Sequence, residues 1–159
     1  MGSTDLLKPV IERHFNGIIH FGRVSVKPGK PTTFATIPYQ GISKPVFALP
    51  GNPASALVTF YIFVIPALRK LGGWPDSICH LPRVDVKVQS RMKLDKRTEF
   101  HRAIINHKLQ AFSTGGQRSS KVASLNGANG LVILPQSGSG FLEVGDTAEA
   151  ILIGEIHIL

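Results

Sequence analysis

An apolar strand that runs directly into a long apolar helix most constrains how this chain folds. Residues 46–49 have the β-branched and aromatic bias of a buried strand, and a nearly continuous apolar run follows over residues 53–71. Asn52 is a good N-cap residue, and Pro53 suits the first helical position, where its missing N–H costs nothing. The sequence therefore predicts an α/β unit in which the first N–H groups of a helix face the end of a sheet.

Such a helix N-terminus suits a phosphate or another oxyanion, because its N–H groups are unpaired and the helix dipole is positive there. Gly51 and the prolines beside it, Pro50 and Pro53, keep bulky side chains away, so the backbone can approach a ligand. Many α/β units have the same capped junction without any ligand. The spacing alone therefore leaves both interpretations open.

The apolar run also poses a question of secondary structure, since residues 59–65 are rich in β-branched and aromatic residues that suit a strand. The N-cap, the length of the run, Arg69 and Lys70 near its end, and the two glycines that follow favour a helix over residues 53–71. Apolar residues cover nearly its whole circumference, which predicts burial in a core or an oligomer interface. Pro66 predicts a kink.

The remaining sequence divides into two parts, residues 1–75 and 76–159. The first part predicts a helix over residues 6–15, capped by Ser3, Thr4 or Asp5, and strands over residues 18–26, 32–37 and 45–49. The second predicts strands over residues 84–88, 100–112, 130–134, 141–144 and 147–153. We expect an α/β part with too few strands for a complete parallel sheet, followed by a small antiparallel β domain that resembles a barrel.

The amino-acid composition limits the kinds of partner that the chain can bind. The 159 residues carry a formal net charge of +8, which favours an anionic partner, but the basic residues form no run of five, which argues against nucleic acid. Cys79 is the single cysteine, as expected in a reducing compartment. The first residues do not resemble a signal peptide, and the apolar run is short for a bilayer span. We therefore expect a soluble cytoplasmic protein that binds an anion in a pocket.

Several polar residues are candidates for that pocket. Arg23 and Lys27 are four residues apart around a predicted strand, so both would lie on one face, where they bind an oxyanion or stand in solvent. Asp5 is either a helix cap or a metal-ligating or acid–base carboxylate. Residues 113–121 form either an anion-binding nest or a flexible hairpin loop. The histidines show no spacing typical of metal ligands.

The order of these segments along the chain is more specific for a protein family than any one segment alone. The blocks are His20-Phe21-Gly22-Arg23, Lys27-Pro28-Gly29-Lys30-Pro31, Pro50–Ala56, Glu99-Phe100-His101-Arg102 and Ser113-Thr114-Gly115. Together they resemble the C-terminal portion of the molybdopterin molybdenumtransferases, the family that includes the gephyrin E domain. The resemblance implies the C-terminal half of a three-layer molybdopterin-binding domain followed by a small β domain, in a truncated form of the family.

The resemblance also implies an activity. Such enzymes of molybdenum cofactor biosynthesis insert molybdate into adenylylated molybdopterin and release AMP, with Mg²⁺ assisting. It further implies a cytoplasmic homodimer that acts on small molecules and binds no nucleic acid. A noncatalytic scaffold of the gephyrin kind, which binds a receptor peptide and meets a membrane only indirectly, is the alternative.

Motif by motif, the resemblance also implies site residues. Asp5, Lys27 and Ser55 would be catalytic, and Asp5 would also be the metal ligand. The substrates would contact a larger set: Arg23, Pro28, Pro50, Gly51, Asn52, Pro53, Arg102, Ser119 and Ser120.

Overall fold

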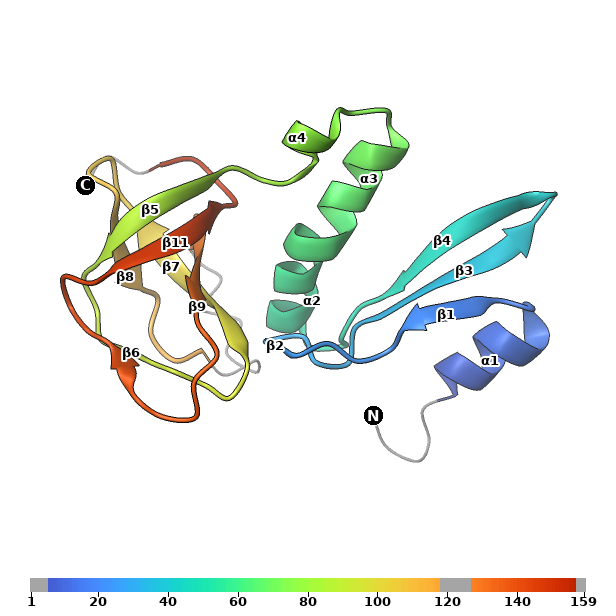
Figure 1. The fold of residues 1–159 in the computed structure, drawn as a ribbon, viewed down its shortest axis with the longest axis horizontal. Helices are drawn as coiled ribbons and strands as arrows, with labels where there is room; N and C mark the ends of the chain where they lie inside the picture. Colours follow the sequence, from blue (N-terminus) through green and yellow to red (C-terminus); the bar gives the residue numbers. More distant parts are fainter. Residues whose placement is uncertain (1–5, 118–126, 157–159) are drawn as a thin grey trace.

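The computed structural model describes residues 6–117 and 127–156. A β-barrel lies at one end of the molecule, a three-stranded sheet with a short helix lies at the other, and a long helix stands between them (Figure 1). The mixed α/β class and the barrel expected from the sequence are confirmed. The division at residues 75 and 76 stays a prediction.

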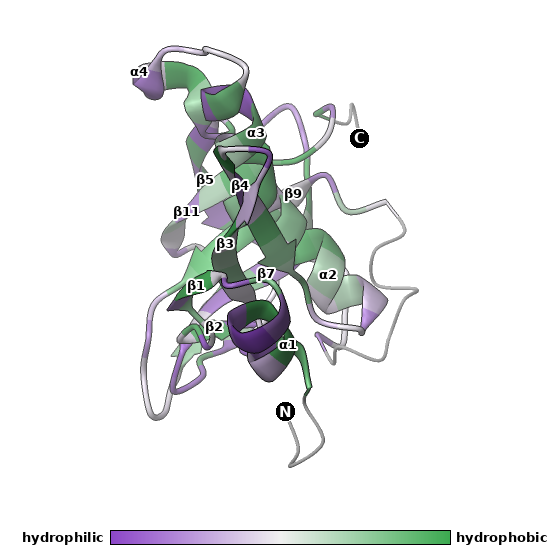
Figure 2. Cartoon of the chain, turned by 90° about the vertical axis from the view of Figure 1, so that its right-hand side faces the viewer, coloured by the Kyte–Doolittle hydropathy of each residue, from purple (hydrophilic) through white to green (hydrophobic). Residues whose placement is uncertain are grey.

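The sheet at one end is built by the first part of the chain. It contains β1 (Ile18–Phe21), β3 (Thr33–Tyr39) and β4 (Ile42–Ala48), in the order β1-β3-β4, and both pairings are antiparallel. Phenylalanine rings join the sheet to the long helix, because Phe21 lies 5.6 Å from Phe34 and 5.9 Å from Phe63 between ring centroids. Figure 2 shows hydrophobic stretches in these strands, whereas the short helix at this end of the molecule is more hydrophilic.

Two expectations for this part need correction. The strand predicted over residues 18–26 is two strands, because β1 ends at Phe21, residues 22–25 belong to no strand, and β2 (Val26–Lys27) pairs in parallel with a barrel strand. The short helix α1 (Leu7–His14) has Leu6 at its N-cap position and no side-chain cap there. The predicted caps, Ser3 to Asp5, lie outside the described residues.

The long helix runs over the predicted residues 53–71, in three segments. It begins as α2 (Pro53–Thr59), widens into the π-helical η1 (Phe60–Val64) and continues as α3 (Ile65–Leu71). The π segment ends two residues before Pro66, which has no N–H for the regular ladder, so the proline is accommodated by a change of helix type.

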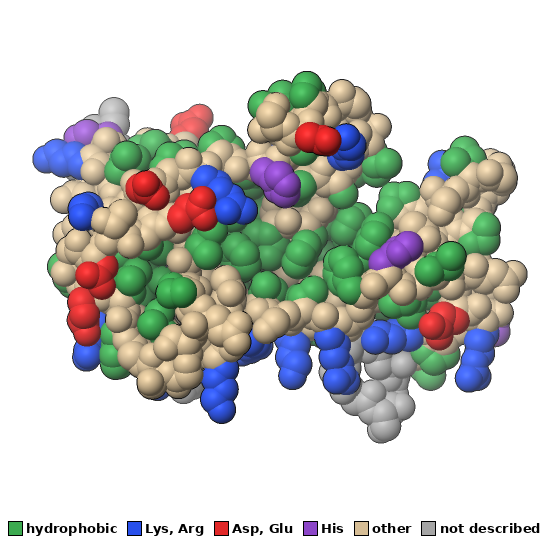
Figure 3. All heavy atoms as spheres, viewed as in Figure 1, with side chains coloured by type: hydrophobic (Ala, Val, Ile, Leu, Met, Phe, Trp, Pro, Cys, Tyr) green, Lys and Arg blue, Asp and Glu red, His purple; other side chains and the backbone are tan. Residues whose placement is uncertain are grey.

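Complete burial of this helix was expected within a core or an interface. Within this chain the core alternative is wrong, because only residues of α2 are buried while Leu68 is 55% and Leu71 65% exposed. Apolar side chains are visible on the surface at the middle of the molecule (Figure 3). The helix is also long and apolar enough to cross a membrane. One helix of this kind is only weak evidence of a membrane span.

The second part of the chain forms the barrel. After α4 (Asp76–Cys79), the strands are β5 (Arg83–Val88), β7 (Thr98–Ile105), β8 (Gln110–Ser113), β9 (Gly130–Leu134) and β11 (Thr147–Leu152). Their order is β7-β8-β5-β11-β9, and the β7–β9 pairing closes the barrel. The pairings are antiparallel except that β5 and β8 are parallel. The two-residue strands β6 (Met92–Lys93) and β10 (Phe141–Leu142) form a separate ribbon.

The strand predicted over residues 100–112 is the hairpin β7–β8. Its turn is stabilised by Asn106, whose side-chain oxygen accepts the backbone N–H groups of Lys108 and Gln110, and Leu109 has a positive φ of 55°. Side chains such as Val88, Met92 and Leu134 fill the barrel interior. On the outside, Val58 of α2 packs with Leu131 and Ile151, so one core cluster fixes the start of the long helix against the barrel.

Candidate functional site

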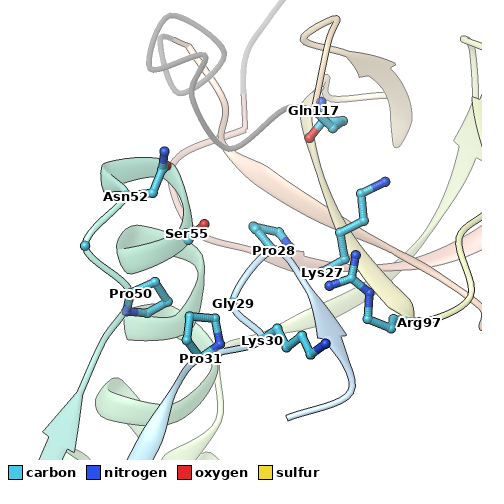
Figure 4. A pocket seen from close by; sticks show the side chains of 11 residues that line it. Lys27, Pro28, Gly29, Lys30, Pro31, Pro50, Asn52, Ser55, Arg97 and Gln117 are labelled. Atoms are coloured by element: carbon cyan, nitrogen blue, oxygen red, sulfur yellow. The ribbon is translucent and has the colours of Figure 1, made fainter. Parts of the chain in front are cut away.

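A pocket of about 610 Å³ opens where the start of the long helix, the turn after β2 and the approach to β7 meet (Figure 4). Its residues come from four separate segments of the chain. They are Lys27, Pro28, Gly29, Lys30, Pro31, Pro50, Gly51, Asn52, Ser55, Arg97 and Gln117.

The helical wall of the pocket forms as the sequence predicts. The side-chain oxygen of Asn52 accepts the Ala54 N–H at 3.1 Å, and Pro53 occupies the first turn. Ser55 is 5% exposed and lies one turn before Thr59, whose hydroxyl donates to the Ser55 carbonyl at 2.9 Å. This arrangement presents a hydroxyl and the first helical N–H groups at one edge of the pocket.

The turn after β2 lies directly on this helix. Gly29 has a φ of 120°, and a Cβ atom there would lie 2.3 Å from Cγ2 of Thr59. The Thr32 hydroxyl donates to the Gly29 carbonyl at 2.7 Å and closes the turn. Only glycine fits this close approach, which sets the position of Lys27 and Lys30 beside the helix.

Lys27 is held by two carboxylates. Its Nζ atom lies 2.8 Å from Oε2 of Glu99 and 3.2 Å from Oδ2 of Asp95. Burial alone would lower the pKa of Lys27, but the two carboxylates outweigh it and raise the pKa above its ordinary value. Lys27 is therefore a permanent cation at neutral pH.

Glu99 is the buried end of this pair, and its side chain is 3% exposed. Burial would raise the pKa of its carboxyl group, but the hydrogen bond from His101 and the ion pair with Lys27 outweigh burial and lower the pKa. Nδ1 of His101 lies 3.2 Å from Oε1 of Glu99, and Nε2 lies 2.7 Å from Oγ of Ser113.

Two further cations line the pocket, Lys30 and Arg97. The Arg97 Nε–H donates to Oδ1 of Asp95 at 3.2 Å, and the Arg97 backbone N–H donates to the same oxygen. Neither cation was predicted as a site residue from the sequence, although Lys30 stands in the Lys-Pro-Gly-Lys-Pro block. Arg97 carries no local signal, because it lies in a polar connection whose position depends on the tertiary fold.

Gln117 forms the opposite wall. Its side-chain oxygen accepts the Arg102 N–H at 2.9 Å, and its Nε2 donates to the carbonyl groups of Arg102 and Gly115 at 3.2 and 3.0 Å. These bonds fasten the segment after β8 to β7.

The structure brings together most of the predicted site residues it describes. Six of them line the pocket: Lys27, Pro28, Pro50, Gly51, Asn52 and Ser55. Pro53 begins the adjacent helix. Arg102 is fully buried in β7, and burial lowers the pKa of its guanidinium, with partial opposition from the charge of Glu99.

Of the other predicted residues, one is placed differently and three are not described. Arg23 is exposed in the connection between β1 and β2 and does not line the pocket, so the expectation of one strand face shared with Lys27 is wrong because β2 begins only at Val26. Asp5, Ser119 and Ser120 lie outside the described residues. Over residues 6–117 and 127–156, no cluster of three or more acidic, histidine or cysteine side chains forms a metal site.

The fold and the pocket place this chain among two-part proteins in which an α/β part and a β-barrel line one basic pocket. Comparison with known proteins shows the family. Residues 1–70 match the family described as a probable molybdopterin binding domain, and residues 85–153 match the MoeA C-terminal region, domain IV. The chain therefore belongs to the molybdopterin molybdenumtransferase family of molybdenum cofactor biosynthesis.

Individual relatives agree with this assignment. Gephyrin from Dictyostelium discoideum is 46% identical over 99% of this chain and 24% of its own length. The molybdopterin molybdenumtransferase of Bacillus subtilis is 34% identical over 98% of this chain and 35% of its own length. The crystal structure of the molybdopterin biosynthesis moeA protein from Pyrococcus horikoshii has the same fold, with a TM-score of 0.67, 22% identity, and coverage of 84% of this chain and 32% of that one. The chain thus spans about a quarter to a third of these relatives.

Proposed function

We propose that this chain takes part in the insertion of molybdate into adenylylated molybdopterin, with release of AMP, and that the pocket binds these anionic substrates. The observation that carries the proposal is that Lys27, Lys30 and Arg97 line the same pocket as Ser55 and the start of the long helix. Molybdate is a dianion and the pyrophosphate of the second substrate adds charge, so cations, a hydroxyl and helix N–H groups match both.

The pocket residues would act by binding and orientation. Lys27 stays protonated because its pKa is raised, and its carboxylate partners fix the ammonium group at the pocket wall. Ser55 would donate a hydrogen bond to an oxyanion oxygen at the helix edge. Arg97 has a planar guanidinium whose Nε–H donates to Asp95. Its terminal N–H groups can bind an oxyanion with two parallel hydrogen bonds.

Mg²⁺ is implied by the family resemblance, but the described part of the chain does not fit it. The carboxylates nearest the pocket, Asp95 and Glu99, are both paired with Lys27, and no acidic cluster occurs among the described residues. Asp5, outside the described residues, stays the proposed ligand.

We also propose a cytoplasmic homodimer in which the boundary at residues 75 and 76 separates two domains. The exposed Leu68 and Leu71 of the long helix and the exposed Trp74 beyond it support a dimer contact, because one chain leaves this apolar surface in water.

Calorimetric titration of the full chain with sodium molybdate tests the pocket. We expect saturable binding that weakens at least about tenfold in Lys27→Ala and Ser55→Ala, since each removes a charge-assisted hydrogen bond to the anion. Lys44→Ala, at an exposed position of β4, is the matched control and should bind as the wild type does. Unchanged binding in both pocket variants would contradict the assignment.

A noncatalytic role in binding a receptor peptide is the second candidate. A separate cleft of about 160 Å³ between the long helix and the barrel favours it, because Tyr61, Phe63 and Phe100 line it with aromatic surface. Capture of the chain by a receptor-loop peptide, with molybdate binding absent, would support this role over the enzymatic one.

A further inference from the structure

His101 connects the two sides of the pocket, yet no step of the proposed function uses it. It lies in β7, and its side chain is only 7% exposed. Because alternate residues of a strand face the same side, His101 and Glu99 share one face of β7. The imidazole therefore stands between a carboxylate of its own strand and Ser113 of the neighbouring strand β8.

The chemistry of the neighbours fixes the direction of these hydrogen bonds. An ionised Glu99 only accepts, so Nδ1 of His101 carries the proton and donates to Oε1. With a single proton on the ring, Nε2 accepts the hydroxyl proton of Ser113. The Ser113 oxygen in turn accepts the Gly115 N–H at 3.1 Å. Each ring nitrogen of His101 thereby holds a neighbour in place.

Both ends of this chain of contacts reach the pocket. At one end, Oε2 of Glu99 lies 2.8 Å from Nζ of Lys27. At the other end, the Gly115 carbonyl accepts the Gln117 Nε2–H at 3.0 Å. Lys27 and Gln117 come from elements distant in sequence, and both line the pocket.

We propose that His101 is a positioning residue, which holds Lys27 through Glu99 and the segment of residues 113–117 through Ser113, and so fixes the two walls of the pocket relative to each other. The proposal rests on the proposed function only for the identity of the bound anion. The order of serine, histidine and carboxylate is that of a serine hydrolase, but here the Ser113 oxygen accepts the Gly115 N–H and serves as a brace.

Two substitutions separate the halves of this contact chain. His101→Gln places an amide nitrogen near the Nε2 position and retains a partner for Ser113, whereas His101→Asn places one near Nδ1 and retains a partner for Glu99. We expect each to weaken molybdate binding about threefold to tenfold, and His101→Ala to weaken it about 10- to 100-fold, the range typical of residues that orient ligating groups. His20→Gln is the matched control, because His20 also contacts a hydroxyl, Thr36 Oγ1, at 2.9 Å on the other sheet.

Free imidazole supplies the readout that a merely structural role would not move. A hollow of about 480 Å³, lined by residues including His101, Glu99 and Ser113, gives a small molecule access to this place. Millimolar imidazole should restore most of the molybdate affinity of His101→Ala and leave that of Lys27→Ala unchanged. Wild-type affinity in His101→Ala, or a loss that imidazole does not reverse in a folded variant, overturns the proposal.

Nitrogen NMR of the histidine ring tests the proposal without molybdate. We expect the proton on Nδ1 of His101 in the wild type, and a shift of that Nδ1 signal in Lys27→Met, because Glu99 then loses its cationic partner. A proton on Nε2, or an Nδ1 signal that Lys27→Met leaves in place, overturns the positioning role. A wild-type chain that fails to bind molybdate but gives the expected NMR result contradicts the proposed function alone.

Discussion

At the residue scale, Glu99 links the stability of the fold to pH. Its pKa and that of Asp95 are lowered in the folded chain, because cationic and hydrogen-bonding partners outweigh the burial that would raise them. A carboxyl group whose pKa is lower in the folded than in the unfolded state stabilises the fold above its ordinary pKa of 4.5. That contribution is lost as the pH falls through the folded value.

Glu99→Gln tests this linkage. We expect the variant to be less stable than the wild type at pH 7 by about 1–3 kcal/mol, less than for a fully buried pair because Lys27 is partly exposed. The difference should shrink as the pH falls below about 4.5, since the wild-type carboxyl group then becomes protonated. Urea unfolding at a series of pH values measures the stability difference and its dependence on pH. A difference independent of pH would show that Glu99 is not ionised in the fold.

Gly29 provides a second test at this scale. Gly29→Ala should destabilise the chain by about 2–4 kcal/mol, because the new methyl group meets Thr59 and the residue has a positive φ. Gly41→Ala is the control, since Gly41 also has a positive φ but open space around it, and should cost about 1 kcal/mol. Thr59→Ser removes the clashing methyl group, so it should recover part of the loss in Gly29→Ala. Thermal melting of the single and double variants measures these effects.

The residue scale also shows why only part of the site could be predicted. Lys27, Asn52 and Ser55 stand in short blocks whose residue types and order were informative along the chain. Glu99 and His101 lie in a block that was noticed, but their contacts with Lys27 and Ser113 depend on strand pairings with β2 and β8. Arg97 reaches the pocket only because the barrel places residues 95–97 beside the turn after β2.

At the scale of elements, local signals predicted well where they were strong. The long helix follows from its N-cap, its length and its terminal glycines, and β9 and most of β5 follow from apolar runs and alternation. The hairpin turn at residues 106–109 was missed because apolar residues flank it closely and the turn depends on Asn106. The two-residue strands β2 and β6 are defined by partners distant in sequence, which no local pattern shows.

The start of the long helix gives the prediction at this scale. Asn52→Ala removes the acceptor for the Ala54 N–H and should cost about 1 kcal/mol of unfolding free energy. Asn52→Ser retains a capping oxygen and should stay close to the wild type. Equal stability of all three chains in urea would show that the side-chain cap contributes nothing to the fold.

At the scale of the whole molecule, the first part of the long helix is packed and its end is exposed. Its first turns pack against the barrel through Val58, and Phe63 meets the sheet, while Leu68 and Leu71 remain more than half exposed. Basic side chains stand along one edge of the molecule, whereas the apolar surface lies toward its middle (Figure 3). A net charge of +8 repels a second copy of the chain, so self-association has to come from apolar contacts.

The double variant Leu68→Glu, Leu71→Glu tests that association. If the end of the helix is the dimer contact, two charges per chain should shift the chain to a monomer, because each would be desolvated without a partner. Val144→Glu is the control, since Val144 is equally exposed, at 61%, but stands in the barrel's connection before β11. Light scattering across a concentration series measures the mass, and molybdate titration of the same samples shows whether the pocket survives. A monomeric wild type would contradict the proposed dimer, and a double variant that remains dimeric would place the contact elsewhere.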